Sequence, residues 1–292
     1  MKKLQNGFYT ALGTPLDRDG KVVAEALEKQ INMQIEAGAA GLLLLGSMGM
    51  QPAIADDVCK ECVRAAAKAN AGRVPLFVGV MDNSVRRVKE RIDAIKEFDI
   101  TGVVLTTPFY FSVRGDEELV KYFEAVADYS PVPLFLYDLP SATKVKMNYP
   151  LVKRLAQHPN IAGIKTADFV LARLLMRNYP DFEVLCSNLD CFDIAMSFGI
   201  CKVLDGMFAC TPVNGNRFIG AALSGDMAAA GNYLDNIVRL RDTFIKYDVM
   251  PAFTTAMNLI GLEGSYAMDY KPLVTGEGAA AVKQVMKEIG EL

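Results

Sequence analysis

Lys165 is the residue that most clearly suggests chemistry, because it ends an apolar run over residues 161–164. Burial in such surroundings disfavours the ammonium form of a lysine and leaves a nucleophilic amine. A neutral amine can attack a carbonyl carbon and form a Schiff base. The alternative is a structural lysine whose tip reaches solvent or pairs with an acid such as Asp138 or Asp205. Position alone favours neither interpretation.

Two further segments could supply the groups that such chemistry needs. Tyr137 follows an apolar run at residues 134–136, and a phenol beside an imine can move protons to and from the substrate oxygen. By itself, a tyrosine in that place is more often a packing residue. Residues 46–49 read Gly-Ser-Met-Gly after four leucines, and the backbone N–H groups of such a turn could hold a carboxylate. Glycine turns are common, so this signal is weak alone.

The elements that must position these residues alternate along the chain. Short β-branched or leucine-rich runs predict eight strands, at residues 8–13, 41–45, 76–80, 102–105, 134–137, 161–165, 182–185 and 202–205. Longer amphipathic runs predict helices between and after them, at residues 24–37, 53–69, 85–97, 117–127, 149–157, 172–178, 190–198 and 212–223.

This alternation predicts an α/β fold, a (β/α)8 TIM barrel over residues 1–225 that carries the active site at the carboxyl ends of its strands. A doubly wound open sheet is less favoured, because residues 13–16 read Gly-Thr-Pro-Leu rather than GxGxxG. Residues 226–292 read as a helical C-terminal extension, with breaks at Pro251, at residues 261–264 and at residues 271–272.

Composition excludes several classes of function. The chain has 292 residues and a net charge of −3, which argues against a nucleic-acid partner. Its apolar runs are too short for a membrane span, and no apolar signal core follows the N-terminus, so we expect a cytoplasmic protein without a membrane partner. One histidine, His158, argues against a metal site. Cys59 and Cys62 have CxxC spacing within a helical pattern, which favours two thiols on one helix face over a zinc or redox site.

The motifs together resemble the dihydrodipicolinate synthase and N-acetylneuraminate lyase family of class I aldolases. The matching segments are residues 46–49, residues 107–110 (Thr-Pro-Phe-Tyr), residues 137–140 (Tyr-Asp-Leu-Pro) and residues 163–165 (Gly-Ile-Lys). They occur in the family's order and spacing, and the similarity covers essentially the whole chain.

The resemblance implies a role for each matched residue. Lys165 would form the Schiff base with pyruvate or another 2-oxo acid, so that no separate cofactor is needed, and Tyr137 would be the general acid and base. Ser47 would connect Tyr137 to Tyr110, the latter reaching in from a neighbouring subunit. The backbone N–H groups of Ser47 and Met48 would hold the carboxylate. Gly206, at the end of the last strand, joins them among the expected substrate-binding residues.

Three departures from the family pattern bear on specificity. Met48 and Met50 stand where the family usually has a second hydroxyl residue and a glutamate. Ala142 stands where dihydrodipicolinate synthases carry an arginine that clamps the carboxylate of the incoming aldehyde, and alanine cannot make that contact. Lys144 is close in sequence, but its ammonium is a point charge on a flexible stem.

We therefore expect a lyase, aldolase or dehydratase that acts on a 2-oxo acid of the sugar-acid type, with pyruvate as product or donor. Two alternatives stay open: a true 4-hydroxy-tetrahydrodipicolinate synthase of lysine biosynthesis, and a catalytically silent 2-oxo acid binding protein. A metal-dependent aldolase lacks a histidine cluster, and a phosphate- or flavin-binding barrel lacks a glycine-rich loop near residues 205–210.

The sequence also predicts a homotetramer built as a dimer of dimers. Phe109, Tyr110 and Phe111 follow the fourth strand, and three aromatic residues at a barrel mouth would expose an apolar patch in a monomer. The alternative is that the two phenylalanines pack under their own loop.

Overall fold

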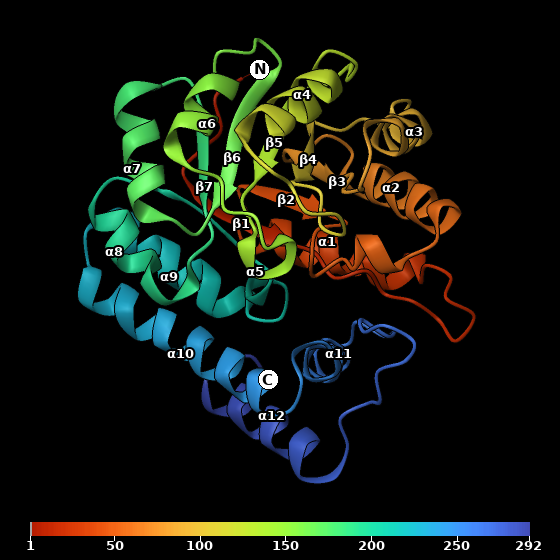
Figure 1. The fold of residues 1–292 in the computed structure, drawn as a ribbon. Coiled ribbons are helices and arrows are strands. Elements are labelled where there is room, and N and C mark those ends of the chain that lie inside the picture. Colours follow the sequence, from red (N-terminus) through yellow and green to blue (C-terminus); the bar gives the residue numbers. More distant parts are fainter. Residues whose placement is uncertain (1) are drawn as a thin grey trace.

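The computed structural model describes residues 2–292 and has a closed barrel of parallel strands at its centre (Figure 1). Each strand pairs with the next in sequence, and β8 pairs with β1. The strands are β1 (Gly7–Ala11), β2 (Gly41–Leu44), β3 (Leu76–Gly79), β4 (Gly102–Thr106), β5 (Leu134–Tyr137), β6 (Ile161–Thr166), β7 (Glu183–Cys186) and β8 (Lys202–Asp205). The predicted (β/α)8 barrel is confirmed.

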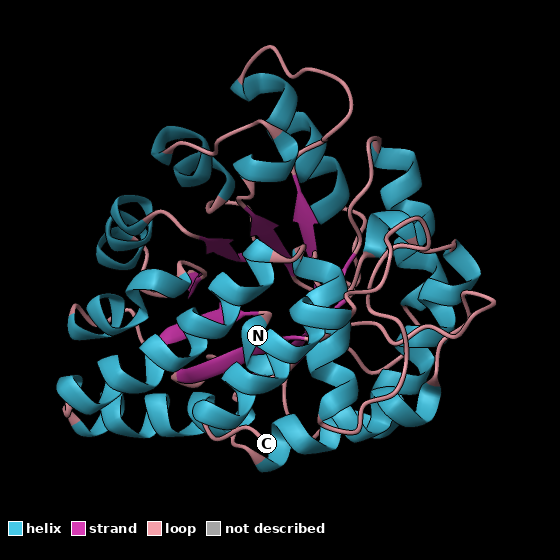
Figure 2. Cartoon of the chain, turned by 90° about the horizontal axis from the view of Figure 1, so that it is seen from below, coloured by secondary structure: helices cyan, strands magenta, loops and turns pink. Residues whose placement is uncertain are grey.

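Helices surround this barrel on its outside, as the view in Figure 2 shows. They are α1 (Ala24–Glu36), α2 (Asp56–Asn70), α3 (Val85–Ile95), α4 (Asp116–Ala127), α5 (Pro140–Thr143), α6 (Tyr149–Leu155), α7 (Phe169–Asn178), α8 (Phe192–Ser197) and α9 (Pro212–Ser224). The predicted helices agree with these within a few residues, except that the sequence pattern missed α5, a single turn that follows β5.

The barrel strands are apolar on both faces, because one face lines the barrel interior and the other meets the helices. The interior cluster includes Tyr9, Leu43, Phe77, Phe135 and Tyr137, which come from four of the strands. A larger cluster fills the space between the strands and the surrounding helices. This double burial explains why the strand segments carry continuous rather than alternating hydrophobic residues.

Three helices follow the barrel, α10 (Met227–Lys246), α11 (Val249–Leu259) and α12 (Gly276–Glu288). In Figure 1 they lie together at one side of the barrel, in blue, and α10 packs along α9. The predicted break near Pro251 is present at residues 247–248, between α10 and α11, and Pro251 itself lies in the first turn of α11, where a missing N–H costs no intrahelical hydrogen bond. The division into units of 1–225 and 226–292 stays a prediction.

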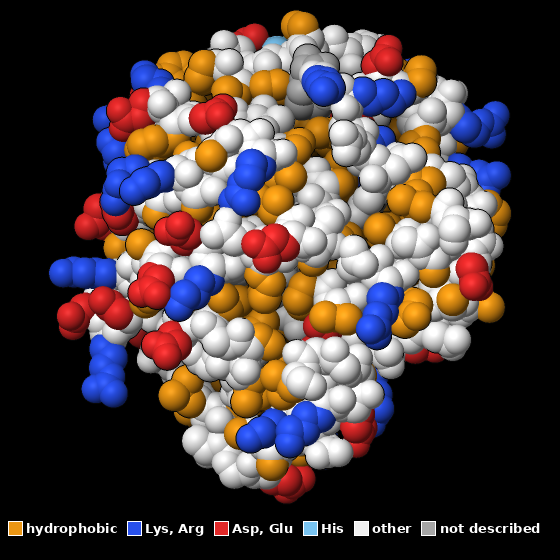
Figure 3. All heavy atoms as spheres, turned by 180° about the vertical axis from the view of Figure 1, so that it is seen from behind, with side chains coloured by type: hydrophobic (Ala, Val, Ile, Leu, Met, Phe, Trp, Pro, Cys, Tyr) orange, Lys and Arg blue, Asp and Glu red, His pale blue; other side chains and the backbone are white. Residues whose placement is uncertain are grey.

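No helix between residues 2 and 292 has the length and apolar character needed to cross a membrane. Acidic and basic side chains are interspersed on the face shown in Figure 3, with hydrophobic side chains between them. All six cysteines are free, and Cys59 and Cys62 are both buried in α2. Burial raises the pKa of the Cys59 thiol to about 11, which disfavours the reactive thiolate.

Candidate active site

Lys165 and Tyr137 meet at the carboxyl end of the barrel because β5 and β6 pair in register. Tyr137 is the direct partner of Lys165 in this pairing, and both side chains are buried. The Lys165 Nζ atom donates a hydrogen bond of 2.6 Å to the Tyr137 hydroxyl. Its nitrogen lies 3.9 Å from the centre of the tyrosine ring. The expected proximity of a nucleophilic amine to a phenol is therefore present in the structure.

Neither acid that could have neutralised Lys165 does so. Within residues 2–292, Lys165 forms no ion pair with a carboxylate. Asp138 turns to the other side of its strand, where it pairs with Lys146 and accepts a hydrogen bond of 2.8 Å from the Thr166 hydroxyl. The structural alternative for Lys165, a paired surface lysine, is not what the structure shows, since only 8% of the residue is exposed.

Asp205 is the second acid near this centre, at the end of β8. Burial raises the pKa of its carboxyl, while the hydrogen bond from the Met207 N–H and the positive charge of Lys165 act in the opposite direction. The Met207 N–H donates to an Asp205 oxygen at 2.8 Å. Asp205 is therefore anchored by the backbone, and it forms no hydrogen bond or ion pair with Lys165 in the described residues.

Ser47 belongs to the turn after β2, which approaches Tyr137 from the opposite side of the barrel mouth. The two hydroxyl oxygens lie 3.4 Å apart, and either can be the donor. Leu45 and Met50, at the two ends of this turn, have positive φ angles of 54° and 55°. The N–H groups of Ser47 and Met48 donate to no other group in the described part of the chain. They are free to bind an anion, as expected for a turn of this kind.

Met48 extends from the same turn across the barrel mouth to Gly206. A methyl group added at Gly206 would come within 2.1 Å of the Met48 Cγ atom, so a larger residue there would require the Met48 side chain to move. The Met48 side chain also packs against the interior cluster that contains Tyr137. The structure thus brings together all three residues expected to bind the substrate, Ser47, Met48 and Gly206, but a thioether now occupies part of that space.

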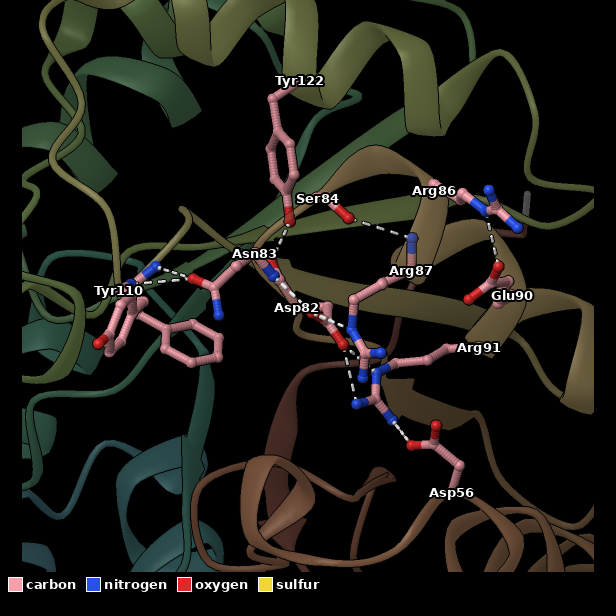
Figure 4. Close-up of polar contacts among 11 residues, drawn as sticks. Asp56, Asp82, Asn83, Ser84, Arg86, Arg87, Glu90, Arg91, Tyr110 and Tyr122 are labelled. Carbon is pink, nitrogen blue, oxygen red and sulfur yellow. Dashed lines mark hydrogen bonds and ion pairs between the residues drawn. The ribbon is translucent and has the colours of Figure 1, made fainter.

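Tyr110 lies apart from this centre within the single chain. It is 79% exposed, and its ring meets that of Phe111 edge to face at 5.0 Å. The loop that carries it is held by Asn83, whose side-chain oxygen accepts hydrogen bonds from the Phe109 and Tyr110 N–H groups at 2.9 Å. Figure 4 shows the phenol pointing away from the polar network behind it. The packing of both phenylalanines under their own loop is not observed, because Phe111 is 71% exposed.

The network behind Asn83 fixes the loop after β3 (Figure 4). Asp82 is buried and accepts hydrogen bonds from Arg87 at 2.8 Å and from Arg91 at 2.9 Å. Burial by itself would raise the pKa of Asp82, but these bonds and the Asn83 N–H together hold that pKa below its ordinary 3.8. Arg91 also pairs with Asp56 at the start of α2 at 2.6 Å. The network therefore ties two loops at the barrel mouth to α2 and α3.

A cavity of about 340 Å3 opens beside Ser47 and Thr106. Methionines dominate its wall, namely Met50, Met81, Met250 and Met268. The sequence interpretation did not include the last two, which come from the C-terminal extension, and placed the active site wholly within residues 1–225. Thr106, at the end of β4, is the register partner of Tyr137 and was identifiable as a strand-end residue. The extension residues carried no comparable signal.

The described residues contain no group of three or more His, Cys, Asp and Glu side chains able to hold a metal ion. His158 lies on the surface of the barrel's other end, where its ring is 3.0 Å from Asp128. The chemical capacity of the site therefore resides in an amine, a phenol, a hydroxyl and the free N–H groups of a turn. This set can form a Schiff base with a 2-oxo acid and move protons around it.

Comparison with known proteins also points to Schiff-base chemistry. The model of the Dihydrodipicolinate synthetase family matches residues 4–289 of the chain. A curated 4-hydroxy-tetrahydrodipicolinate synthase from Laribacter hongkongensis is 31% identical over 253 residues, which is 84% of this chain and 85% of that protein. The enzyme of the same name from Ligilactobacillus salivarius is 27% identical, over 87% of this chain and 88% of that protein.

Solved structures share the fold. The crystal structure of YagE, a prophage protein from E. coli K12 of the dihydrodipicolinic acid synthase family in complex with pyruvate, superposes with a TM-score of 0.91. It is 24% identical, and the match covers 99% of this chain and all of that one. A monomeric dihydrodipicolinate synthase variant, 21% identical, also gives a TM-score of 0.91, with 99% of this chain and 98% of that one covered.

Proposed function

The chain belongs to the dihydrodipicolinate synthetase family, and from this premise we propose that it is a lyase that forms or cleaves a carbon–carbon bond of a 2-oxo acid through an imine on Lys165. The enzyme class follows from the family, whose members are pyruvate-dependent class I aldolases. The observation that carries the proposal is the 2.6 Å hydrogen bond between the Lys165 amine and the Tyr137 hydroxyl at the barrel mouth.

In the proposed cleavage reaction, the Lys165 amine adds to the C2 carbonyl, and Tyr137 gives its proton to the hydroxyl that leaves as water. The Tyr137 phenolate then takes the C4 hydroxyl proton, the C3–C4 bond breaks, and its electrons form an enamine while the aldehyde leaves. Tyr137 returns the proton to C3. Water then hydrolyses the imine, which releases pyruvate and the free amine. Condensation is the reverse sequence.

The remaining site residues would bind and align the substrate. The free N–H groups of Ser47 and Met48 lie at the edge of the centre formed by Tyr137 and Lys165, where they would receive the C1 carboxylate. The Ser47 hydroxyl would continue the proton path toward Tyr110 of a second copy. Its distance of 3.4 Å from the Tyr137 oxygen is long for a hydroxyl pair, so this contact would tighten when substrate binds.

The second candidate is a 4-hydroxy-tetrahydrodipicolinate synthase, which is favoured by the names of the curated relatives described above. Ala142 argues against it, because that position lines the cavity and offers a methyl group to the incoming aldehyde. The sugar-acid class expected from the sequence has no support from the names of these relatives. A silent binding protein would share the imine but not the turnover.

Trapping of the imine tests the role of Lys165, and pyruvate release from a panel of 4-hydroxy-2-oxo acids separates a lyase from a silent binding protein. The protein is incubated with pyruvate and borohydride, and the mass increase is mapped after digestion. We expect a single modified residue, Lys165, and no modification in Lys165→Met. The matched control is Lys202→Met, because Lys202 is also on a barrel strand but pairs with Glu183 at the opposite end. Labelling at another lysine, or none at saturating pyruvate, would refute the assignment.

A further inference from the structure

The methionine-lined cavity adjoins the proposed reaction centre at the barrel mouth. It shares Ser47 and Thr106 with the barrel mouth. The Ser47 hydroxyl contacts the Tyr137 hydroxyl, and Thr106 is the register partner of Tyr137 on the neighbouring strand. Its volume of about 340 Å3 lies within the range of small-molecule sites. The cavity is therefore positioned to hold the group attached to C4 of the substrate.

The wall of this cavity carries no Lys, Arg, His, Asp or Glu side chain. The nearest cations in sequence have other partners: Lys144 donates to the Ser141 carbonyl at 2.7 Å, and Lys146 pairs with Asp138 and Asp168. A second carboxylate on the substrate would lose its hydration without gaining a counter-charge, which is costly. The wall thus selects against an acidic aldehyde.

Hydroxyl-rich substrates would also find few partners there. Thr143 is one of the few polar residues of the wall, and its hydroxyl already donates to the Leu139 carbonyl at 3.1 Å. Most of the wall is thioether, methyl and ring surface, from residues that include Met81, Leu139 and Phe109. Because each unpaired hydroxyl costs binding energy on burial, this lining disfavours a polyol chain.

One polar group is free within the apolar wall. The Thr106 hydroxyl is buried and has no hydrogen-bond partner in the described residues. Buried hydroxyls are normally paired, so an unpaired one on a residue that lines a cavity is available to a ligand group once the neighbouring side chains adjust. Since Thr106 is the register partner of Tyr137, this hydroxyl is suited to the oxygen on C4, which is the aldehyde oxygen after cleavage.

From these observations we infer that the second reactant is an aldehyde that carries an uncharged apolar group, with a single aromatic ring as the best fit. Methionine side chains adapt to flat rings and make favourable contacts with them through sulfur. Phe109 and Tyr270 add ring surface to the same wall. The inference rests on the proposed function, because it names the reactant that Lys165 and Tyr137 would join to pyruvate.

The test compares three 4-hydroxy-2-oxo acids that differ only in the group on C4: phenyl, carboxymethyl and dihydroxyethyl. Pyruvate release gives kcat/KM for each. We expect kcat/KM for the phenyl compound to exceed kcat/KM for each of the other two by about 100-fold or more. This is the usual scale of discrimination when a polar substrate group meets an apolar pocket wall. A preference for the carboxylate or the polyol compound would overturn the inference.

An Ala142→Arg variant sharpens the comparison, because Ala142 is exposed and lines the cavity. We expect kcat/KM to fall by about 10-fold for the phenyl compound and to rise by at least that factor for the carboxymethyl compound, since an arginine can pair with its carboxylate. The control is Ala280→Arg, on an exposed face of α12 away from the cavity, which should change neither value. Unchanged specificity in Ala142→Arg would contradict the assignment of this wall.

Imine trapping on the same samples separates two kinds of failure. If Lys165 is modified and one of the other two compounds is cleaved faster than the phenyl compound, the inference on the aldehyde fails while the proposed function stands. If Lys165 is modified but none of the compounds releases pyruvate, the protein is a silent binder and both proposals fail. If Lys165 is not modified, the proposed function fails and the inference fails with it.

Discussion

Tyr137 is held on one side by the Lys165 amine and on the other by the Ser47 hydroxyl. A phenol between these two groups can give a proton in one step and take one back in the next. Both neighbours can hydrogen-bond to the phenol oxygen whether it is protonated or ionised. In the proposed reaction the proton donor would be the Tyr137 phenol, because the nearby Asp138 carboxylate is paired with Lys146 and hydrogen-bonded by Thr166.

We expect Tyr137→Phe to keep the fold and to lower kcat by about 100-fold or more, which is the usual scale for the loss of a general acid and base. The ring packing is retained, so the effect should lie in kcat rather than in stability. Steady-state pyruvate release and a thermal melt measure the two quantities. A loss of less than fivefold would show that another group moves the proton.

Asp82 should make the protein more stable above about pH 4 than below it. Its pKa in the folded state is held below 3.8 despite burial, so its stabilising effect is present above the pKa of the unfolded chain and is lost as the pH falls through the folded value. We expect Asp82→Asn to lower the free energy of unfolding by about 1 to 3 kcal/mol at pH 7, because a charge-assisted bond to Arg91 is weakened.

Denaturant unfolding between pH 7 and pH 3 checks this effect. The difference in the free energy of unfolding between wild type and Asp82→Asn should shrink as the pH drops below 3.8. Asp235→Asn is the control, because Asp235 is exposed on α10 and forms no ion pair in the described residues. A constant difference at all pH values would show that Asp82 acts through shape rather than charge.

At the scale of elements, β6 presents Lys165 because of the glycine two residues before it. Gly163 pairs in register with Phe135, and a methyl group at Gly163 would come within 2.6 Å of the Phe135 ring and 2.5 Å of the Glu183 carbonyl. The ring therefore fills the layer of the barrel beneath the amine. Since both contacts are with buried, well-packed groups, the strand cannot accept a larger residue without moving.

We expect Gly163→Ala to lower the free energy of unfolding by about 1 to 3 kcal/mol, the usual cost of overpacking a core. Because the displaced strand carries Lys165, imine trapping should also slow. Gly220→Ala is the matched control: Gly220 lies in α9 with no atom near the added methyl group, so alanine should leave stability unchanged or raise it. Equal stability of the two variants would refute this account of Gly163.

At the scale of the whole molecule, the exposed side chains of Tyr110 and Phe111 favour an interface with another subunit. Two large aromatic side chains, 79% and 71% exposed, lie on a loop that Asn83 holds in place. A fixed exposed apolar surface is typical of an interface rather than of a mobile loop. The tetramer and the shared site stay predictions, and one similar solved structure is a monomeric synthase variant.

We expect light scattering at micromolar concentration to give four times the mass of one chain. Tyr110→Phe should leave this mass unchanged and lower kcat by about 10-fold or more, because only a proton-relay hydroxyl is removed. Phe111→Asp should dissociate the assembly and lower activity with it. A monomer with full activity would rule out both the tetramer and the shared site.

The sequence by itself determined the barrel and the pair at its centre. Strand and helix periods are local properties of the chain, and a closed barrel of consecutive parallel strands places the ends of β5 and β6 side by side. The order of the strands therefore predicts the contact of Tyr137 with Lys165 without any knowledge of loop conformations.

Only the tertiary structure decided what surrounds that pair. The turn of Asp138 toward Lys146, the contact of Met48 with Gly206 and the closure of the cavity by Met250 and Met268 all depend on loops and on packing between segments far apart in sequence. Such contacts leave no periodic signal, because each is set by the shape of several elements at once. The contact between the Lys165 amine and the Tyr137 phenol was thus predictable from the chain, whereas the lining of the neighbouring cavity was not.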